Sequence, residues 1–237
     1  MSSPGQFHGI YPDFAAALSA VPESSPVGYD RDEMATLYQE RLDRVFPCDY
    51  PIMFWLGRNL KPGLKIFDVG GHVGLSFYGY RDRLPLPADA VWMVQDLPRI
   101  VNAGVALARD RGDLRLTFTE HLNDADGADI LIASGSLQYI ESPLASVLAA
   151  ITTRPPVLLL HKLPLTDGPS FVTLQNTVHS FNPYRVFNRT EFVRSFAAVG
   201  YQLVDSWDDN QRSCLLPYAP ERSVPHYTGL CLRRDEF

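Results

Sequence analysis

Runs of apolar residues alternate with helical patterns along most of the chain. Seven runs have the length of buried strands: Leu64–Val69, Val91–Gln95, Leu114–Phe118, Ile130–Ala133, Val157–Leu160, Tyr201–Trp207 and Tyr227–Leu232. Ser142–Thr153 and Asn188–Val199 instead repeat apolar residues at helical spacing. Strands that alternate with helices predict an α/β domain with a seven-stranded, mostly parallel sheet. Such sheets bind ligands at the carboxyl ends of their strands.

The first 60 residues have a different pattern. They are predicted to form an N-terminal helical cap, with the α/β domain over residues 61–237. A short helix is expected at Asp13–Ala20, and Asp32–Phe46 places apolar side chains on one helical face. The aromatic side chains of the first 30 residues, Tyr29 among them, are candidates for a lid over the site. A packed N-terminal extension is the alternative.

Composition narrows the possible partners. The 237 residues are 46% apolar and 20% charged, as in an ordinary globular protein, and the net charge is −6. Without a basic run we expect no nucleic-acid partner, and no apolar stretch is long enough to span a membrane. Three scattered cysteines without a C-x-x-C predict neither disulfides nor a metal site. We therefore expect a cytoplasmic protein that acts on a small molecule, in an oligomeric state left open.

One strand runs into a glycine-rich turn that carries candidate chemistry. The turn reads Asp68-Val69-Gly70-Gly71-His72-Val73-Gly74, and Asp96 ends the following strand. His72 stands where a dinucleotide fingerprint needs its second glycine, and the lysine of a phosphate-binding loop is absent. An acid before the turn and an acid after the next strand remain to be explained.

This pair of acids resembles the S-adenosylmethionine (SAM) site of class I methyltransferases. Their D-x-G-x-G-x-G motif is matched at Asp68, Gly70 and Gly74, with His72 in place of the middle glycine. The resemblance implies a Rossmann-like class I methyltransferase fold in which Asp96 accepts from both ribose hydroxyls and Leu97 lies against the adenine. His72 either contacts the methionine part of SAM or only fills the turn. The implied cofactor-binding residues are Asp68, Gly70, Gly71, His72, Gly74, Asp96, Leu97, Ser134, Gln138 and Tyr29.

The stretch after the fourth strand lacks a base. Gln95-Asp96-Leu97-Pro98 resembles the form of the motif found in small-molecule O-methyltransferases, whose catalytic histidine would correspond to Gln138. A glutamine side chain does not titrate, so it cannot take a proton from an acceptor hydroxyl. This departure argues against ordinary base-assisted methylation.

Most of the chain is similar to a bacterial family of methyltransferase-like proteins. The shared features are the Asp68–Gly74 turn, the Ser134–Tyr139 stretch, and Tyr184–Arg189 followed by Gly200-Tyr201. That family includes enzymes that cyclise SAM to azetidine-2-carboxylate and release methylthioadenosine. The resemblance therefore implies a SAM cyclase, in which a neutral α-amine attacks the γ-carbon of the same molecule.

Cyclisation calls for neutral polar groups and aromatic faces rather than a strong base. Tyr139 and Asn176 are the candidates to orient the amine, with a packing tyrosine and a turn residue as the alternatives. His179 is the candidate base if the protein is instead a methyltransferase with a small-molecule or sugar acceptor; a surface histidine is its alternative. A non-catalytic SAM-binding module is the third hypothesis.

Overall fold

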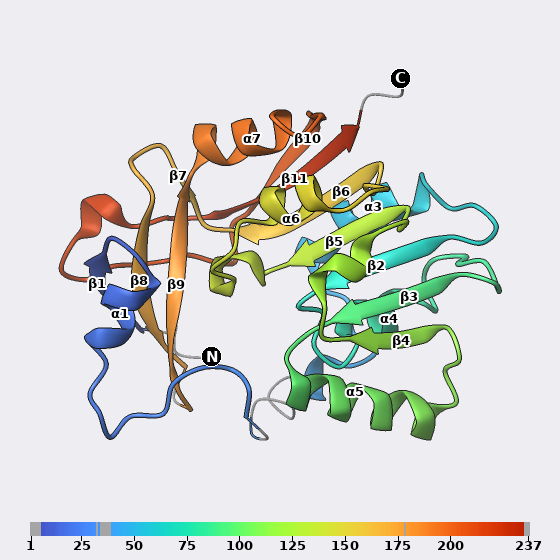
Figure 1. The fold of residues 1–237 in the computed structure, drawn as a ribbon, viewed down its shortest axis with the longest axis horizontal. Helices are drawn as coiled ribbons and strands as arrows, with labels where there is room; N and C mark the ends of the chain where they lie inside the picture. Colours follow the sequence, from blue (N-terminus) through green and yellow to red (C-terminus); the bar gives the residue numbers. More distant parts are fainter. Residues whose placement is uncertain (1–5, 32, 34–38, 178, 235–237) are drawn as a thin grey trace.

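A computed structural model describes residues 6–31, 33, 39–177 and 179–234 of the chain (Figure 1). Its strands are β1 (Gln6–Tyr11), β2 (Lys65–Val69), β3 (Val91–Gln95), β4 (Leu116–Thr119), β5 (Ile130–Ser134), β6 (Val157–Leu163), β7 (Leu165–Thr166), β8 (Phe171–Asn176), β9 (Phe181–Asn188), β10 (Tyr201–Asp209) and β11 (Tyr227–Arg234). Its α-helices are α1 (Phe14–Ser19), α3 (Tyr50–Gly57), α4 (Leu75–Tyr80), α5 (Pro98–Arg111), α6 (Leu144–Ala150) and α7 (Arg189–Ala197). The 3-10 helices are η1 (Gln39–Arg41), η2 (Pro47–Asp49), η3 (Leu122–Ala125), η4 (Leu137–Tyr139) and η5 (Pro220–Arg222).

The seven predicted strands form one sheet, in the order β10-β11-β6-β5-β2-β3-β4. β6, β5, β2, β3 and β4 run parallel, whereas β11 runs antiparallel to both of its neighbours. The prediction of a seven-stranded, mostly parallel sheet is therefore confirmed. The central strands read as continuous apolar runs because helices cover both of their faces.

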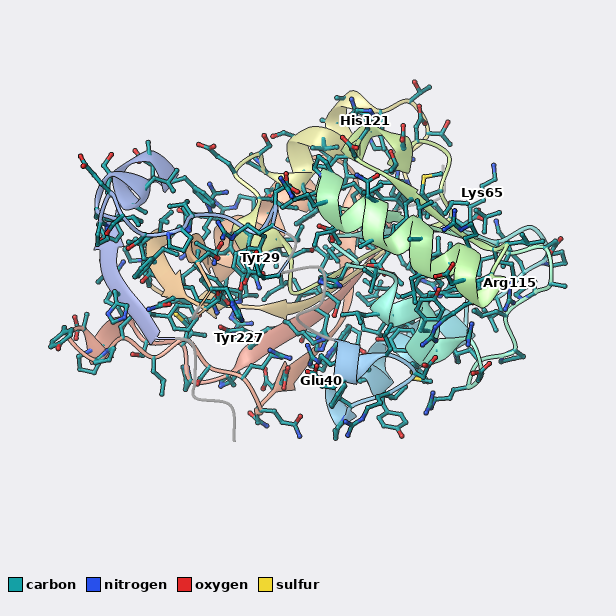
Figure 2. The ribbon with its side chains drawn as sticks, turned by 90° about the horizontal axis from the view of Figure 1, so that it is seen from below. Tyr29, Glu40, Lys65, Arg115, His121 and Tyr227 are labelled. Atoms are coloured by element: carbon teal, nitrogen blue, oxygen red, sulfur yellow. The ribbon has the colours of Figure 1, made fainter. Side chains whose placement is uncertain are left out.

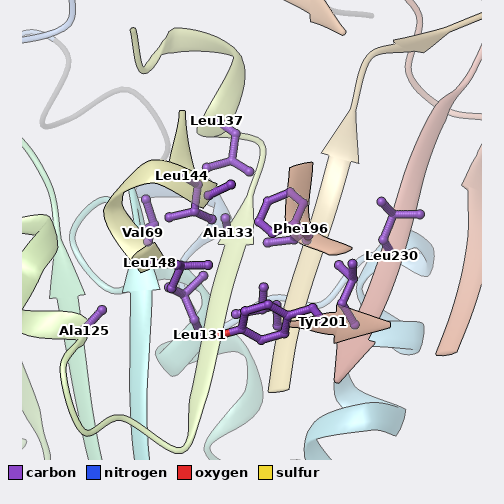
Figure 3. Close-up of a cluster of buried hydrophobic side chains, with 14 of the residues drawn as sticks. Val69, Ala125, Leu131, Ala133, Leu137, Leu144, Leu148, Phe196, Tyr201 and Leu230 are labelled. Carbon is purple, nitrogen blue, oxygen red and sulfur yellow. The ribbon is translucent and has the colours of Figure 1, made fainter. Parts of the chain in front are cut away.

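Successive residues of the central strands enter two different cores. Leu131 and Ala133 of β5 pack with α6 and α7 on one face (Figure 3), and Ile130 and Ile132 pack with α3 and α4 on the other. Leu148 of α6 is fully buried in the first of these cores. At about 25 cal/mol per Å² of apolar surface, this burial on both faces makes the central strands the stable frame of the molecule.

A second sheet was not predicted from the sequence. It has the order β1-β8-β9-β7, and β1 pairs antiparallel with β8, with Phe7 opposite Gln175. Figure 1 shows β8 and β9 on the side toward which the arrowheads of β3 and β6 point, which is the side of the carboxyl ends of these strands. This second sheet therefore stands where a ligand of the large sheet would bind.

The N-terminal cap differs from its prediction. The expected short helix is α1, which Asp13 caps by accepting a hydrogen bond from the Ala16 amide at 2.7 Å. The predicted cap is not wholly helical, however, because its first described segment is the strand β1, whose backbone pairs with β8 in the small sheet. The division at residue 60 stays a prediction, although β1 and β8 pair across it.

The predicted helix over Asp32–Phe46 falls partly outside the described residues, which leave out 32 and 34–38. Of its described residues, 33 is helical and 39–46 hold the short η1, a turn and irregular chain, whereas the unpredicted α3 follows at Tyr50. None of the helices among the described residues is long and apolar enough to cross a membrane.

Candidate functional site

The carboxyl ends of the parallel strands and the inner face of the small sheet enclose one large cavity. Its volume is about 590 Å³, within the usual range for a small-molecule site. Residues of both sheets and of the segment before α3 line it. Three groups of side chains face this space: the glycine turn with Asp96, a set of tyrosines, and a buried ion pair.

The glycine turn has the backbone that the sequence pattern implies. Gly70 and Gly74 have φ values of +64° and +92°, a region that glycine occupies without strain. A Cβ on Gly70 would lie 2.3 Å from the Cβ of Ser136, so no larger residue fits there. His72 adopts φ of +57° despite its side chain, and its backbone N–H donates to Asp96 at 2.8 Å.

Asp96 is held as a double acceptor. Its two carboxylate oxygens accept from the backbone N–H groups of His72 and Leu97, each at 2.8 Å. Each oxygen keeps a second lone pair, which suits a ligand diol. Leu97 lines the cavity with 40% of its surface exposed, so it offers an apolar face beside that carboxylate. This geometry fits a ribose with a flat base next to it.

Two buried acceptors in the cavity lack a donor among the described residues. Asp68 is fully buried; Trp92 Nε1 donates to its Oδ2 at 3.2 Å, but its Oδ1 has no partner. Gln138 is 3% exposed and donates through Nε2 to the Gly135 carbonyl, which leaves its Oε1 without a donor. Burial raises the pKa of Asp68 to about 7. Buried acceptors without donors are costly, so both atoms indicate a ligand that brings N–H groups.

Four tyrosines and one glutamine form the opposite wall, here called the tyrosine wall: Tyr29, Tyr139, Tyr184, Tyr227 and Gln175. The Tyr139 ring meets Tyr29 edge-on at 4.9 Å and Tyr184 at 5.2 Å between ring centres. Figure 2 shows Tyr29 and Tyr227 toward the middle of the molecule, with Lys65 and Arg115 well to one side. Aromatic faces of this kind attract a cation.

Hydrogen bonds fix the orientation of these rings. The Tyr139 hydroxyl donates to Gln175 Oε1 at 2.6 Å, and the Tyr184 hydroxyl donates to the Tyr227 hydroxyl at 2.6 Å. Burial raises the pKa of Tyr184 well above its ordinary value, so this hydroxyl keeps its proton. The wall therefore presents neutral rings rather than phenolate bases.

The structure brings most of the predicted binding residues to the cavity. Asp68, Gly70, Gly71, His72, Asp96, Leu97, Ser134, Gln138, Tyr139 and Tyr29 all line it. Gly74 begins α4 just behind the turn, where a Cβ would lie 2.8 Å from Leu116. Tyr29 lies in the tyrosine wall and also packs against Val73 of the glycine turn and Ile100 of α5.

Two predicted residues are not brought to the cavity. Asn176 follows Gln175 in β8, and because adjacent side chains of a strand point to opposite faces, Gln175 takes the place expected of Asn176. His179 is exposed in the turn after β8 and is not among the lining residues. Neither side chain is among the residues that line the cavity, so the role of Asn176 and His179 in the site stays a prediction.

A histidine in β6 is structural. His161 is fully buried and accepts from Trp207 Nε1 at 3.2 Å, and burial lowers its pKa to about 2. Its ring lies with Cys48 and Asp209 in a cluster of side chains of the metal-binding type. Because Trp207 donates to Nδ1, the single proton of the neutral ring is on Nε2.

Several lining residues were missed by sequence reasoning. Gln175 lies on β8 and Tyr184 on β9, two strands that were not predicted from the sequence. Lys162 comes two residues after the apolar run Val157–Leu160, near the strand end where site residues are expected in such sheets. Nothing in the local sequence indicates that Asp49 is buried.

Comparisons with known proteins bear on the fold. No family model matches the sequence, and no curated protein matches it. A 1,6-didemethyltoxoflavin N1-methyltransferase from Burkholderia thailandensis, solved with S-adenosylhomocysteine, is 18% identical over 98% of this chain and 100% of its own, with a TM-score of 0.56. The [4+2]-cyclase SpnF is 15% identical over 79% of this chain and 82% of its own, with a TM-score of 0.52.

The magnesium protoporphyrin IX methyltransferase of Synechocystis, with bound S-adenosylhomocysteine, is 18% identical over 78% of this chain and 81% of its own, with a TM-score of 0.52. At these identities the likeness establishes the fold. The chain thus has the Rossmann-like fold of class I SAM-dependent methyltransferases, as its glycine turn implied.

Proposed function

We propose that the protein is a SAM-dependent enzyme that cyclises SAM to azetidine-2-carboxylate and releases methylthioadenosine. The observation that carries the proposal is the aromatic character of the cavity wall opposite the glycine turn. A methyltransferase needs room for an acceptor beside the methyl group of SAM, and the proposal assigns that side of the cavity to the tyrosine wall.

The size of the cavity agrees with a single ligand. An apolar cavity of about 150 Å³ holds one benzene molecule, or roughly 25 Å³ for each non-hydrogen atom. On that scale about 590 Å³ takes roughly 24 such atoms, close to the ~27 of SAM. The cavity therefore accommodates one ligand of the size of SAM.

SAM fits the polar groups of the cavity. Asp96 suits the ribose hydroxyls, and the methionine part then runs over Gly70 and Gly71 toward Asp68. Asp68 Oδ1 and Gln138 Oε1, the two acceptors without donors, suit the N–H groups of the α-amine. The tyrosine wall suits the sulfonium, with a cation–π contribution of about 0.5–2 kcal/mol.

The reaction needs only these groups. The α-nitrogen forms a bond to Cγ, the Cγ–S bond breaks with its electron pair left on sulfur, and one N–H proton leaves. In a dry pocket, transfer of that proton from the ammonium to Asp68 removes two buried charges, so it precedes attack readily. The neutral amine keeps two N–H groups, one of which Gln138 Oε1 can accept, and its lone pair attacks Cγ once it turns away from the Asp68 O–H.

A small-molecule methyltransferase is the second candidate. The likeness to the toxoflavin-precursor methyltransferase extends over 98% of the chain, its N-terminal segment included, which supports this alternative. Neither His161 nor His179 is among the residues that line the cavity, so methyl transfer would rely on an acceptor that is already nucleophilic.

Incubation of the purified protein with SAM alone, followed by mass spectrometry, tests the proposal. Cyclisation yields methylthioadenosine and azetidine-2-carboxylate in equal amounts, and Asp96→Asn abolishes both products by weakening binding. Asp110→Asn, an exposed change on α5, is the matched control and retains activity. SAM that is bound but left intact contradicts cyclisation, and turnover that requires an added acceptor supports the methyltransferase.

A further inference from the structure

A β-bulge turns one lysine into the cavity. In the pairing of β6 with β11, Leu160 faces Leu230 and Leu163 faces Thr228, so His161 and Lys162 together oppose Gly229. Lys162 has φ of +58°, a left-handed conformation that costs a residue with a side chain about 1–2 kcal/mol. Bulges beside functional sites commonly re-aim a side chain. The fold thus accepts backbone strain at the residue that carries this ammonium group.

The Lys162 ammonium lies between two elements of the site. Its Nζ is 3.1 Å from Ser134 Oγ, at the end of β5, and 3.5 Å from Asp49 Oδ1, just before α3. The lysine side chain is 13% exposed and that of Asp49 is 8% exposed. An ammonium has three N–H donors, and these two partners account for at most two of them. Lys162 therefore retains donor capacity within the cavity that it lines.

The other cations that line the cavity are engaged elsewhere. Arg212 Nε lies 3.5 Å from the buried carboxylate of Asp209. Arg41 and Arg44 lie over the ring of Phe46, on the N-terminal segment. Of these four cations that line the cavity, Lys162 is the one that contacts the end of β5. Gln138, whose Oε1 is a buried acceptor without a donor among the described residues, lies in the segment that follows β5.

We propose that Lys162 binds the α-carboxylate of SAM and makes the site specific for a ligand with an intact amino-acid end. This inference rests on the proposed binding of SAM. Strands β6, β5 and β2 are neighbours, so their ends place Lys162, Gln138 and Asp68 along one edge of the sheet. Asp68 Oδ1 and Gln138 Oε1 suit the ammonium group of an α-amino acid, and the Lys162 ammonium beside them suits its carboxylate. A carboxylate held at Lys162 also limits rotation about Cα and directs the amine toward Cγ.

Binding of three unreactive ligands tests the assignment by calorimetry. S-adenosylhomocysteine carries the carboxylate, its decarboxylated analogue keeps only the amine, and methylthioadenosine lacks both. The wild-type protein is expected to bind S-adenosylhomocysteine about 10- to 100-fold more tightly than the decarboxylated analogue, as for a charge-assisted hydrogen bond. In Lys162→Met this preference falls to about 2-fold or less, while the affinity for methylthioadenosine stays within about 2-fold.

Lys65→Met is the matched control, because Lys65 is exposed at the far end of β2 (Figure 2), and it keeps the full preference. The comparison of ligands on the wild-type protein needs no variant, so the test survives if Lys162→Met fails to fold. Equal wild-type affinity for the two amine ligands, or an unchanged preference in Lys162→Met, overturns the role of Lys162. A wild-type protein that binds neither S-adenosylhomocysteine nor methylthioadenosine instead overturns the proposed function.

Discussion

The indole N–H of Trp92 donates to Asp68 Oδ2 at 3.2 Å, and this contact joins the cavity to the core of the large sheet. Trp92 lies on β3 and Asp68 on β2, in the core face that α3 and α4 cover. Asp68 Oδ2 accepts this hydrogen bond, but Oδ1 has no donor among the described residues, so the ionised carboxylate destabilises the ligand-free fold.

Replacement of Asp68 changes how stability depends on pH. The pKa of Asp68 is about 7 in the fold and about 3.9 when unfolded, so its favourable contribution is full below pH 4 and is lost as the pH rises through 7. Ligand-free Asp68→Asn is therefore expected to gain stability over the wild type by up to about 4 kcal/mol at pH 9, with the gain much smaller at pH 5. Urea unfolding at both pH values measures this, and a gain independent of pH would contradict it.

Two glycine substitutions separate backbone strain from steric conflict. Gly63 and Gly70 have nearly equal φ values, +66° and +64°, but a Cβ on Gly63 meets nothing within 4 Å. Gly63→Ala is expected to cost about 1 kcal/mol from strain alone. Gly70→Ala also strikes Ser136, which adds about 1–3 kcal/mol and weakens SAM binding. Equal losses of unfolding free energy for the two variants, measured in urea, would show that the turn shifts to make room for the added Cβ at Gly70.

The ring and the hydroxyl of Tyr139 have separable roles. Tyr139→Phe keeps the ring and loses the hydrogen bond to Gln175, whereas Tyr139→Leu loses the ring. If the ring stabilises the sulfonium, kcat for SAM consumption falls about 3- to 30-fold in Tyr139→Leu and less than about 3-fold in Tyr139→Phe. An equal fall in both variants would assign the effect to the hydroxyl.

The Tyr184–Tyr227 hydrogen bond supports the wall. Tyr227→Phe leaves the buried Tyr184 hydroxyl without its 2.6 Å partner and is expected to cost about 1–2 kcal/mol of unfolding free energy. Tyr218→Phe is the control, because Tyr218 is 94% exposed, and its effect is expected to be near zero. Equal stability of both variants in thermal unfolding would mean that Tyr184 finds another partner.

The local sequence pattern was sufficient to predict the large sheet. Alternating residues of buried strands, such as Leu131 and Ile132, determine which side chains enter which core, because the pleat repeats every two residues. The glycine turn and Asp96 were likewise predictable, since positive φ at Gly70 and an acid at a strand end are local requirements. The sequence by itself therefore determined the large sheet and the part of the site that belongs to it.

Only the tertiary structure decided which side chains lie opposite the carboxyl ends of the strands of the large sheet. Tyr29 meets Tyr139 and Gln175 because the segment just before it pairs with β9, where Val27 lies opposite Phe181. Lys162 meets Asp49 because a bulge redirects one side chain toward the N-terminal segment. Such contacts join residues far apart in the chain, and their register depends on how whole sheets pack. Gln175 rather than Asn176 faces the cavity for the same reason, since one step along a strand reverses the face.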